Sequence, residues 1–301
     1  MRVGSLCTGY GGLDMAVEAY FNAEMVWCAE NDKYASSLIE QRFNKLNYGD
    51  IKQIDWDNVE PIDILTAGYP CQPFSHAGQR KGKDDERHIW PDILKAISVL
   101  RPKIVILENV RGHLSLGFKE VLSDLAQIGY NASWQIVRAS DVGAPHPRAR
   151  LFIIAYPISQ GLQGGGWQKT GIRSKTITDT NSNACSKSRR TTSSISTASA
   201  GLSTRQDKRQ TRSKYRSSCE MAKQTIPPTL VDGKLNAKFV EYMMGLPVGW
   251  VTDLDLSRSQ QLKMLGNGVV PQQAYHALEI LCDSSHISYN ETEFANAHSP
   301  T

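Results

Sequence analysis

The chain is best understood by starting from eight residues, Gly68-Tyr69-Pro70-Cys71-Gln72-Pro73-Phe74-Ser75. They directly follow the apolar run 62–67, which predicts a buried strand. The two prolines stiffen the turn around Cys71, because proline fixes φ and biases the residue before it toward extended geometry. A thiol at the end of a strand lies where open α/β sheets hold their ligands. Cys71 is therefore a candidate nucleophile, although a free cysteine more often serves as a half-buried structural residue.

The length and composition are those of a soluble globular protein of one large domain, or of one large and one small domain. No run is apolar enough to span a bilayer, and the N-terminus predicts a first strand and not a signal peptide. The cysteines form no C-x-x-C pair, which argues against zinc and disulfides and favours a reducing cytoplasm. They are Cys7, Cys28, Cys71, Cys185, Cys219 and Cys282.

Charge is distributed unevenly along the chain. The net charge is only +4, but residues 157–235 hold 14 lysines and arginines against 4 acids. This segment is rich in Gly, Ser and Thr and shows no sustained apolar periodicity, which favours partial disorder until a partner is met. A basic segment on an acidic body predicts a polyanionic partner. A solvated linker that happens to be basic is the competing interpretation.

The first fifty residues suggest a nucleoside site. A strand at 3–6, a glycine turn at 7–12 and a helix at 13–21 open a nucleotide-binding βα unit. The turn lacks the third, spaced glycine of the dinucleotide fingerprint, so an ordinary tight turn is also compatible with it. Glu30 follows the second strand, where an acid usually holds ribose hydroxyls, and Asp50 offers a second acid near the expected adenine position. Together they favour a nucleoside cofactor.

Two further stretches carry candidate catalytic groups. Glu108 follows the buried strand 104–107, so partial desolvation should raise the pKa of its carboxyl and suit it to proton donation. Arg148 and Arg150 alternate before the strand 151–155, so on an extended chain both point the same way. Two guanidinium groups on one face can bind a carboxylate, a phosphate or a base carbonyl. The structural alternatives are that Glu108 caps the turn that follows it and that the two arginines form plain salt bridges.

Apolar periodicity predicts the remaining elements. The further strands are 25–29 and 132–137, and the further helices are 34–43, 89–100, 118–128, 237–244, 258–265 and 274–281. Ser257 and Gln260 match a capping box, and a glycine turn is expected at 266–271. The loop 76–87, which contains two glycines, is placed to close over a substrate.

Taken in order, five stretches resemble the DNA (cytosine-5)-methyltransferase family. They are Leu6-Cys7-Thr8-Gly9-Tyr10-Gly11-Gly12-Leu13-Asp14, the stretch around Cys71, Glu108-Asn109-Val110, Arg148-Ala149-Arg150 and Gly266-Asn267-Gly268-Val269-Val270-Pro271. Cys7 stands where the family usually has Phe, and His146 stands where it has Gln. The resemblance implies an α/β fold, namely a Rossmann-like S-adenosylmethionine-dependent methyltransferase sheet of mixed strand direction with a small target-recognition domain.

The resemblance also assigns parts of the chain. Residues 1–156 would be the first part of a catalytic and cofactor-binding domain, 157–235 the target-recognition segment, 236–282 the return to the catalytic domain, and 283–301 a flexible tail. S-adenosylmethionine would be held by Leu6, Thr8, Gly9, Gly11, Gly12, Glu30, Asp50, Ile51, Pro70, Asn267 and Val269. Of the two arginines, the resemblance favours Arg150 as the contact to the base carbonyl.

The implied reaction is methylation of carbon 5 of a flipped-out cytosine in double-stranded DNA, through a covalent Cys71 adduct and without a metal. The implied protein is a cytoplasmic monomer with no membrane partner. A cognate restriction endonuclease that acts separately is a further partner consistent with this interpretation. Three alternatives stay open at this point. They are an RNA cytosine methyltransferase, an NAD-dependent oxidoreductase with a reactive thiol, and a DNA-binding protein without catalysis.

Overall fold

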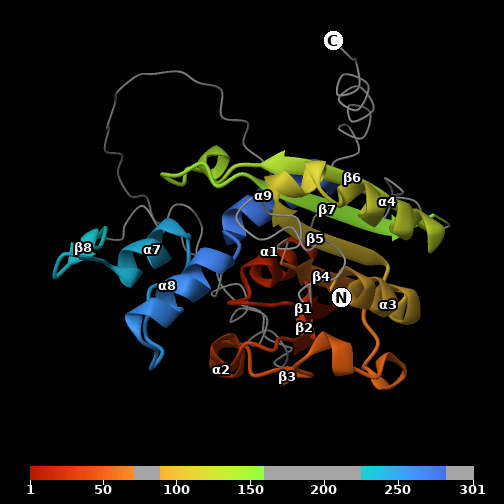
Figure 1. Ribbon diagram of the computed structural model, residues 1–301, viewed down its shortest axis with the longest axis horizontal. Helices are drawn as coiled ribbons and strands as arrows, with labels where there is room; N and C mark the ends of the chain where they lie inside the picture. The colour runs from red at the N-terminus through yellow and green to blue at the C-terminus, as the bar shows by residue number, and fades with distance from the viewer. Residues whose placement is uncertain (71–88, 159–224, 283–301) are drawn as a thin grey trace, which may run out of the picture.

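A seven-stranded mixed sheet forms the centre of the molecule (Figure 1). The computed structural model describes residues 1–70, 89–158 and 225–282. The strand order is β3-β2-β1-β4-β5-β7-β6. The strands are β1 (Arg2–Leu6), β2 (Glu24–Ala29), β3 (Leu46–Asn47), β4 (Ile64–Gly68), β5 (Ile104–Val110), β6 (Tyr130–Val137) and β7 (Arg150–Pro157). Strands β1 to β5 pair in parallel and β7 is antiparallel to both of its neighbours, so the expected mixed α/β sheet is confirmed.

The helices begin and end close to the positions that the sequence predicts. They are α1 (Gly12–Phe21), α2 (Lys33–Arg42), α3 (Trp90–Leu100), α4 (Phe118–Gln127), α7 (Ala237–Met243), α8 (Arg258–Asn267) and α9 (Pro271–Cys282). The predicted capping box is present, since Ser257 accepts from the Gln260 N–H and Gln260 accepts from the Ser257 N–H. Within the described ranges, no helix combines the length and the apolar character that a membrane crossing requires.

Alternating side chains of the strands feed two separate apolar layers. On one face Leu65 and Leu107 pack in a cluster with α3 and α4, while on the other Ile64 and Ile106 pack with α1 and α9. Helix α9 comes from the end of the described chain and lies beside α1 from its beginning (Figure 1). Residues more than 250 positions apart in the sequence therefore pack against one another on this face of the sheet.

Three boundaries differ from the predictions. Strand β5 continues through Glu108 to Val110, because β7 pairs with it to the end, Val110 lying opposite Arg150. Helix α8 includes Gly266 and Asn267, which the sequence predicts in a turn. The edges of the basic segment are also ordered, since β7 reaches Pro157 and a hairpin of β8 (Leu230–Val231) and β9 (Lys234–Leu235) precedes α7. The extension of β5 arises from its pairing with β7, a tertiary contact that local propensity does not report.

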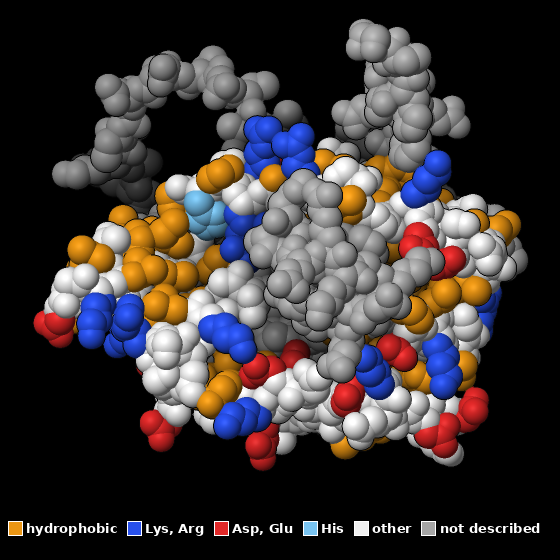
Figure 2. All heavy atoms as spheres, in the orientation of Figure 1, with side chains coloured by type: hydrophobic (Ala, Val, Ile, Leu, Met, Phe, Trp, Pro, Cys, Tyr) orange, Lys and Arg blue, Asp and Glu red, His pale blue; other side chains and the backbone are white. Residues whose placement is uncertain are grey.

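Exposed apolar side chains lie on the β8–β9 hairpin and on both sides of the segment 159–224. Leu230 is 56% exposed, and Ile158 and Ile226, which flank the segment 159–224, are exposed to a similar degree. Figure 2 shows hydrophobic side chains gathered over the region where Figure 1 places β8, α7 and α8. The segment 159–224 and the tail 283–301 lie outside the described residues, as does the loop 76–87.

Candidate active site

Three neighbouring strands bring the candidate catalytic groups to one place. Gly68 pairs with Glu108 across β4 and β5, and a Cβ built on Gly68 would lie 3.6 Å from the Glu108 Oε2 atom. Arg150, the first residue of β7, holds its Nε 3.0 Å from Glu108 Oε1. Cys71 itself lies outside the described residues, but the strand that leads to it ends against Glu108. The order β4-β5-β7 thus gathers three stretches that are 40 or more residues apart in sequence.

Glu108 is a buried carboxyl group, with 7% of its surface exposed. Burial raises its pKa to about 7, and the positive charges of Arg150 and Arg148 oppose this rise. The expected upward shift is confirmed, although the residue lies inside its strand and not just after it. A carboxyl group with this pKa is present in both protonation states near neutrality and can donate or accept a proton there.

The two arginines do different things, which corrects the expectation that both project from an extended chain. Arg148 lies before β7 with a φ of 31°, in the left-handed region. Its Nη2 donates to the carbonyls of Gly266, at 2.8 Å, and Gly268, at 2.6 Å. These bonds satisfy carbonyls at the C-terminus of α8 and explain why the helix runs on through Gly266. Arg150 alone is paired with the Glu108 carboxylate.

The glycine loop after β1 combines one open glycine with two packed ones. Gly9 has a φ of 57°, faces open space and donates its N–H to Glu30 Oε2 at 2.8 Å. Gly11 also has a left-handed φ, and a Cβ there would collide with the ring of Phe43. A Cβ on Gly12 would collide with the carbonyl oxygen of Val269. Only Gly9 therefore leaves room for a ligand to approach the backbone, while the other two allow close packing.

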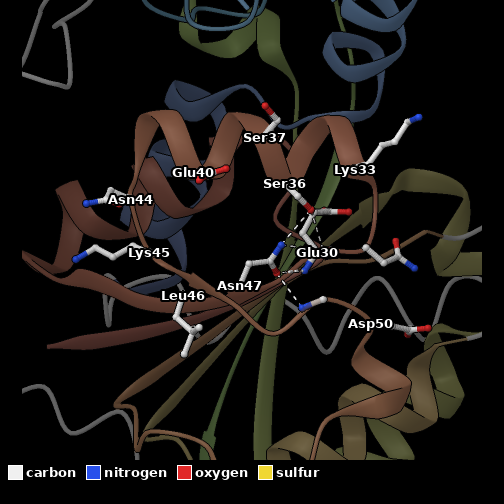
Figure 3. A pocket seen from close by; sticks show the side chains of 12 residues that line it. Glu30, Lys33, Ser36, Ser37, Glu40, Asn44, Lys45, Leu46, Asn47 and Asp50 are labelled. Atoms are coloured by element: carbon white, nitrogen blue, oxygen red, sulfur yellow. Dashed lines mark hydrogen bonds between the residues drawn. The ribbon is translucent and has the colours of Figure 1, made fainter.

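A surface cavity of about 850 Å³ contains both of the predicted acids, Glu30 and Asp50 (Figure 3). Glu30 accepts hydrogen bonds from the N–H groups of Gly9 and Asp32, one on each carboxylate oxygen. Burial raises the pKa of Glu30, and the backbone N–H groups of Asp32, Gly9 and Asn31 partly oppose the rise. Each oxygen keeps a further acceptor position, so the acid can still receive ribose hydroxyls. Carboxylate acceptors at this place fit the ribose hydroxyls of S-adenosylmethionine.

The other residues expected at the cofactor differ in exposure. Leu6, Thr8, Ile51 and Val269 are buried, whereas Pro70 and Asn267 are exposed. Cys7 has a φ of 53°, and burial raises the pKa of its thiol, with smaller contributions from Glu30 and Asp50. The substituted cysteine therefore lies within the electrostatic reach of both predicted acids.

Several supporting residues were given no role in the sequence analysis. Asp14 is almost fully buried and accepts a 2.6 Å hydrogen bond from the Thr66 hydroxyl, which joins α1 to β4. Asn109 donates to the Tyr69 carbonyl, and the Tyr69 hydroxyl lies 3.0 Å from His113 Nε2. Burial lowers the pKa of His113 to about 4, so its ring is neutral at physiological pH. Asp14, Tyr69 and Asn109 lie in stretches that carry the family resemblance, and Asp14 is also an acid in the apolar face of a predicted helix.

No group of three or more His, Cys, Asp or Glu side chains within residues 1–70, 89–158 and 225–282 has an arrangement suited to a metal ion. The acids named above each have hydrogen-bonding partners from the protein. Glu30 is bonded to backbone N–H groups, Asp14 to Thr66, and Glu108 to Arg150.

Comparisons with known proteins agree with this geometry. The family model described as C-5 cytosine-specific DNA methylase matches residues 1–226. The Type II methyltransferase M.BsuFI of Bacillus subtilis is 32% identical over 169 residues, which cover 54% of this chain and 41% of that protein. M.HhaI of Haemophilus parahaemolyticus is 34% identical over 168 residues, which cover 54% of this chain and 51% of that protein. The chain spans about half the length of the curated relatives it matches.

A solved structure shows the same fold at low identity. The methyltransferase EhMeth of Entamoeba histolytica superposes with a TM-score of 0.60 at 18% identity, covering 95% of this chain and 98% of that one. The expected Rossmann-like methyltransferase fold is thereby confirmed. Because the family model covers most of its length, the chain belongs to the C-5 cytosine-specific DNA methylase family.

Proposed function

We propose that this protein transfers a methyl group from S-adenosylmethionine to carbon 5 of cytosine in double-stranded DNA. The observation that carries the proposal is the buried Glu108, paired with Arg150 beside the end of the strand that leads to Cys71. A carboxyl group with a pKa of about 7 next to a fixed guanidinium suits a base that must be protonated on a ring nitrogen and held by its carbonyl.

In this proposal Cys71, Glu108 and Arg150 carry out the steps of the reaction on the base. The Cys71 thiolate adds to carbon 6 of a flipped-out cytosine, which turns carbon 5 into a nucleophile. Glu108 donates its proton to ring N3, and Arg150 holds the carbonyl oxygen. S-adenosylmethionine supplies the methyl group from its sulfonium. The carbon 5 proton then passes to water, N3 returns its proton to the Glu108 carboxylate, and elimination of the Cys71 thiolate releases the methylated base.

The assignment of Arg150, and not Arg148, as the base contact follows from the pairing of the two side chains. The Arg148 guanidinium donates to two backbone carbonyls that join the C-terminal helices to the sheet. Arg150 points at Glu108 and is about 18% exposed at its side chain, so a flipped base can reach it. Both residues act on Glu108 electrostatically, but it is Arg150 whose Nε contacts the Glu108 carboxylate, while its Nη1 donates to the Ala149 carbonyl.

We further propose that the basic segment 157–235 delivers the DNA. Its excess of lysine and arginine complements a phosphate backbone, which supplies most of the sequence-independent affinity. The relatives are named Type II methyltransferases, which supports a restriction endonuclease as a separate companion of this protein. We propose a cytoplasmic monomer, because a single copy of the chain contributes Glu108, Arg150 and the predicted cofactor acids.

The test is a mechanism-based trap. The full chain is incubated with S-adenosylmethionine and duplex DNA containing 5-fluorocytosine, since fluorine cannot leave carbon 5 as a proton does. The expected result is a denaturation-resistant adduct at Cys71, absent from the Cys71→Ser variant. S-adenosylhomocysteine binding, measured by calorimetry, should be unchanged in that variant. Methyl transfer by Cys71→Ser at the wild-type rate would contradict the covalent mechanism.

The same trapping experiment, together with the binding measurement, distinguishes the proposed DNA methyltransferase from the three alternative functions. An adduct with 5-fluorocytosine RNA but not with DNA would move the assignment to an RNA cytosine methyltransferase. Binding of NAD in place of S-adenosylhomocysteine would favour the oxidoreductase. Cofactor binding without an adduct on either nucleic acid would favour a protein that binds DNA without catalysis.

A further inference from the structure

Asn47, the last residue of the edge strand β3, uses both ends of its side-chain amide on the backbone around the predicted ribose acid. Its Oδ1 accepts hydrogen bonds from the N–H groups of Glu30 and Gly49, each at 3.0 Å. Its Nδ2 donates to the Glu30 carbonyl and to the Ser36 hydroxyl, also at 3.0 Å. Figure 3 shows these side chains meeting beneath α2, with the bonds dashed.

The position of Asn47 explains this pattern. The pairing of β2 with β3 ends at Cys28 and Asn47, so beyond that point the two chains separate. A carboxamide carries the same donor and acceptor as a peptide group, and the Asn47 side chain bonds both the N–H and the carbonyl of Glu30, just beyond the last paired residue of β2. The side chain therefore joins the two chain segments at the point where their backbone pairing ends.

The bond to Gly49 extends the effect to the second predicted acid. Gly49 has a φ of 77°, and its N–H is held by Asn47 just before Asp50 caps the short helix η1 (Ile51–Gln53). One amide thus ties the backbone of Glu30 to the turn that presents Asp50. Glu30, Asn47 and Asp50 all line the cavity of about 850 Å³.

We propose that Asn47 is a positioning residue for the ribose of S-adenosylmethionine, which it serves by holding Glu30 and the turn before Asp50 at a set separation. The proposal rests on the cofactor assignment above. Asn47 does not need to touch the ligand. Its contribution is preorganisation, since the acid reaches the ribose without first losing the freedom of its backbone.

The test is a double comparison of ligand and variant, by calorimetry on the full chain. The probes are S-adenosylhomocysteine and its 2′-deoxy analogue, which lacks one ribose hydroxyl. We expect wild type to bind the analogue about tenfold more weakly, the usual effect of losing one hydrogen bond to a charged group. Asn47→Ala should weaken S-adenosylhomocysteine by about tenfold and lose most of the discrimination between the two probes.

A matched control separates positioning from stability. Asn236 has an equivalent structural task away from the cavity, because its side chain accepts from the Lys238 N–H and donates to the Pro228 carbonyl. Asn236→Ala should lower the melting temperature but leave both dissociation constants unchanged. If Asn47→Ala does not fold, the milder substitutions Asn47→Ser and Ser36→Ala replace it in the test. Each of these variants is expected to discriminate less between the two probes.

Two outcomes would overturn the proposal. In the first, a folded Asn47 variant keeps the full wild-type discrimination, whatever its overall affinity. In the second, Asn236→Ala loses discrimination as Asn47→Ala does, which would make the effect one of general stability. Wild type that binds neither probe would instead refute the cofactor assignment, so the two failures are distinguishable.

Discussion

Glu108 shows how one residue acquires its chemistry from neighbours in space. Four buried apolar residues precede it in β5, and the pairing of β5 with β4 and β7 removes it from water. Desolvation alone would keep the proton on the carboxyl group, and the Arg150 guanidinium draws the pKa back to about 7. The result is a group that is poised at the working pH of the cell.

A pH profile tests this balance. An acid must carry its proton to donate it, so ionisation of Glu108 should make kcat/KM fall about tenfold per pH unit above pH 7, while protonation of the Cys71 thiolate lowers kcat/KM at acid pH. Glu108→Gln should lose about 10²- to 10⁴-fold in kcat, because it cannot give up a proton. Steady-state kinetics between pH 5.5 and 9, on a short duplex carrying the target, measure both.

Arg150→Gln supplies the control for that profile. Arg150 lowers the pKa of Glu108, so its removal should move the falling limb to higher pH in whatever activity is left. A limb that stays near pH 7 after this change, or one that persists in Glu108→Gln, would assign the ionisation to another group.

At the scale of elements, the first and last recognisable stretches are locked together. The Tyr10 hydroxyl donates to the Val269 carbonyl at 2.8 Å, and a Cβ on Gly12 would strike that same carbonyl oxygen. The Trp250 indole N–H donates to the Tyr10 carbonyl at 2.9 Å. The glycine loop after β1 therefore packs against Val269, in the turn that precedes α9.

Gly12→Ala tests this contact. The added methyl group has no space, so we expect a loss of about 1–3 kcal/mol in the free energy of unfolding, the usual cost of overpacking. Gly112→Ala is the control, because a Cβ there meets nothing within 4 Å and its φ is not left-handed. Urea unfolding monitored by fluorescence compares the two, and equal stabilities would contradict the close approach.

At the scale of the whole molecule, residues before and after the basic segment build one body. The cluster that contains Val3, Met25 and Ile64 also contains Leu278 and Leu281 of α9. Gln273 adds a buried polar link, since its Nε2 donates to the carbonyls of Val137 and Arg148 at 2.7 Å each. The chain thus crosses from 158 to 225 and returns to the same core.

Replacing residues 161–223 with a flexible Gly-Ser linker of about 20 residues tests whether this segment binds DNA while the rest of the chain binds the cofactor. We expect the shortened protein to unfold cooperatively and to bind S-adenosylhomocysteine as wild type does, because both halves of the core remain. Its affinity for duplex DNA should fall, and so should the salt dependence of that affinity. If the shortened protein still methylates the original target sequence, the segment is a linker and not the reader of DNA.

Local order was largely predictable from the sequence. The strands that precede Gly68 and Glu108, the amphipathic helices and the capping box at Ser257 all follow from periodicity and side-chain chemistry within a few residues. Five stretches in order were enough for the family resemblance. The upward pKa shift of Glu108 was also predictable, because a carboxyl group beside four apolar residues is desolvated in any strand that is buried.

Tertiary structure decided what these residues do to one another. The sequence presents Arg148 and Arg150 as an alternating pair, but a left-handed backbone at Arg148 and the pairing of Arg150 opposite Val110 send them to different partners. The same holds for Gly12, which makes room for Val269, and for Asn47, which bonds Glu30 from the neighbouring strand. Such roles depend on contacts between residues far apart in the chain, and periodicity carries no information about which strands will become neighbours.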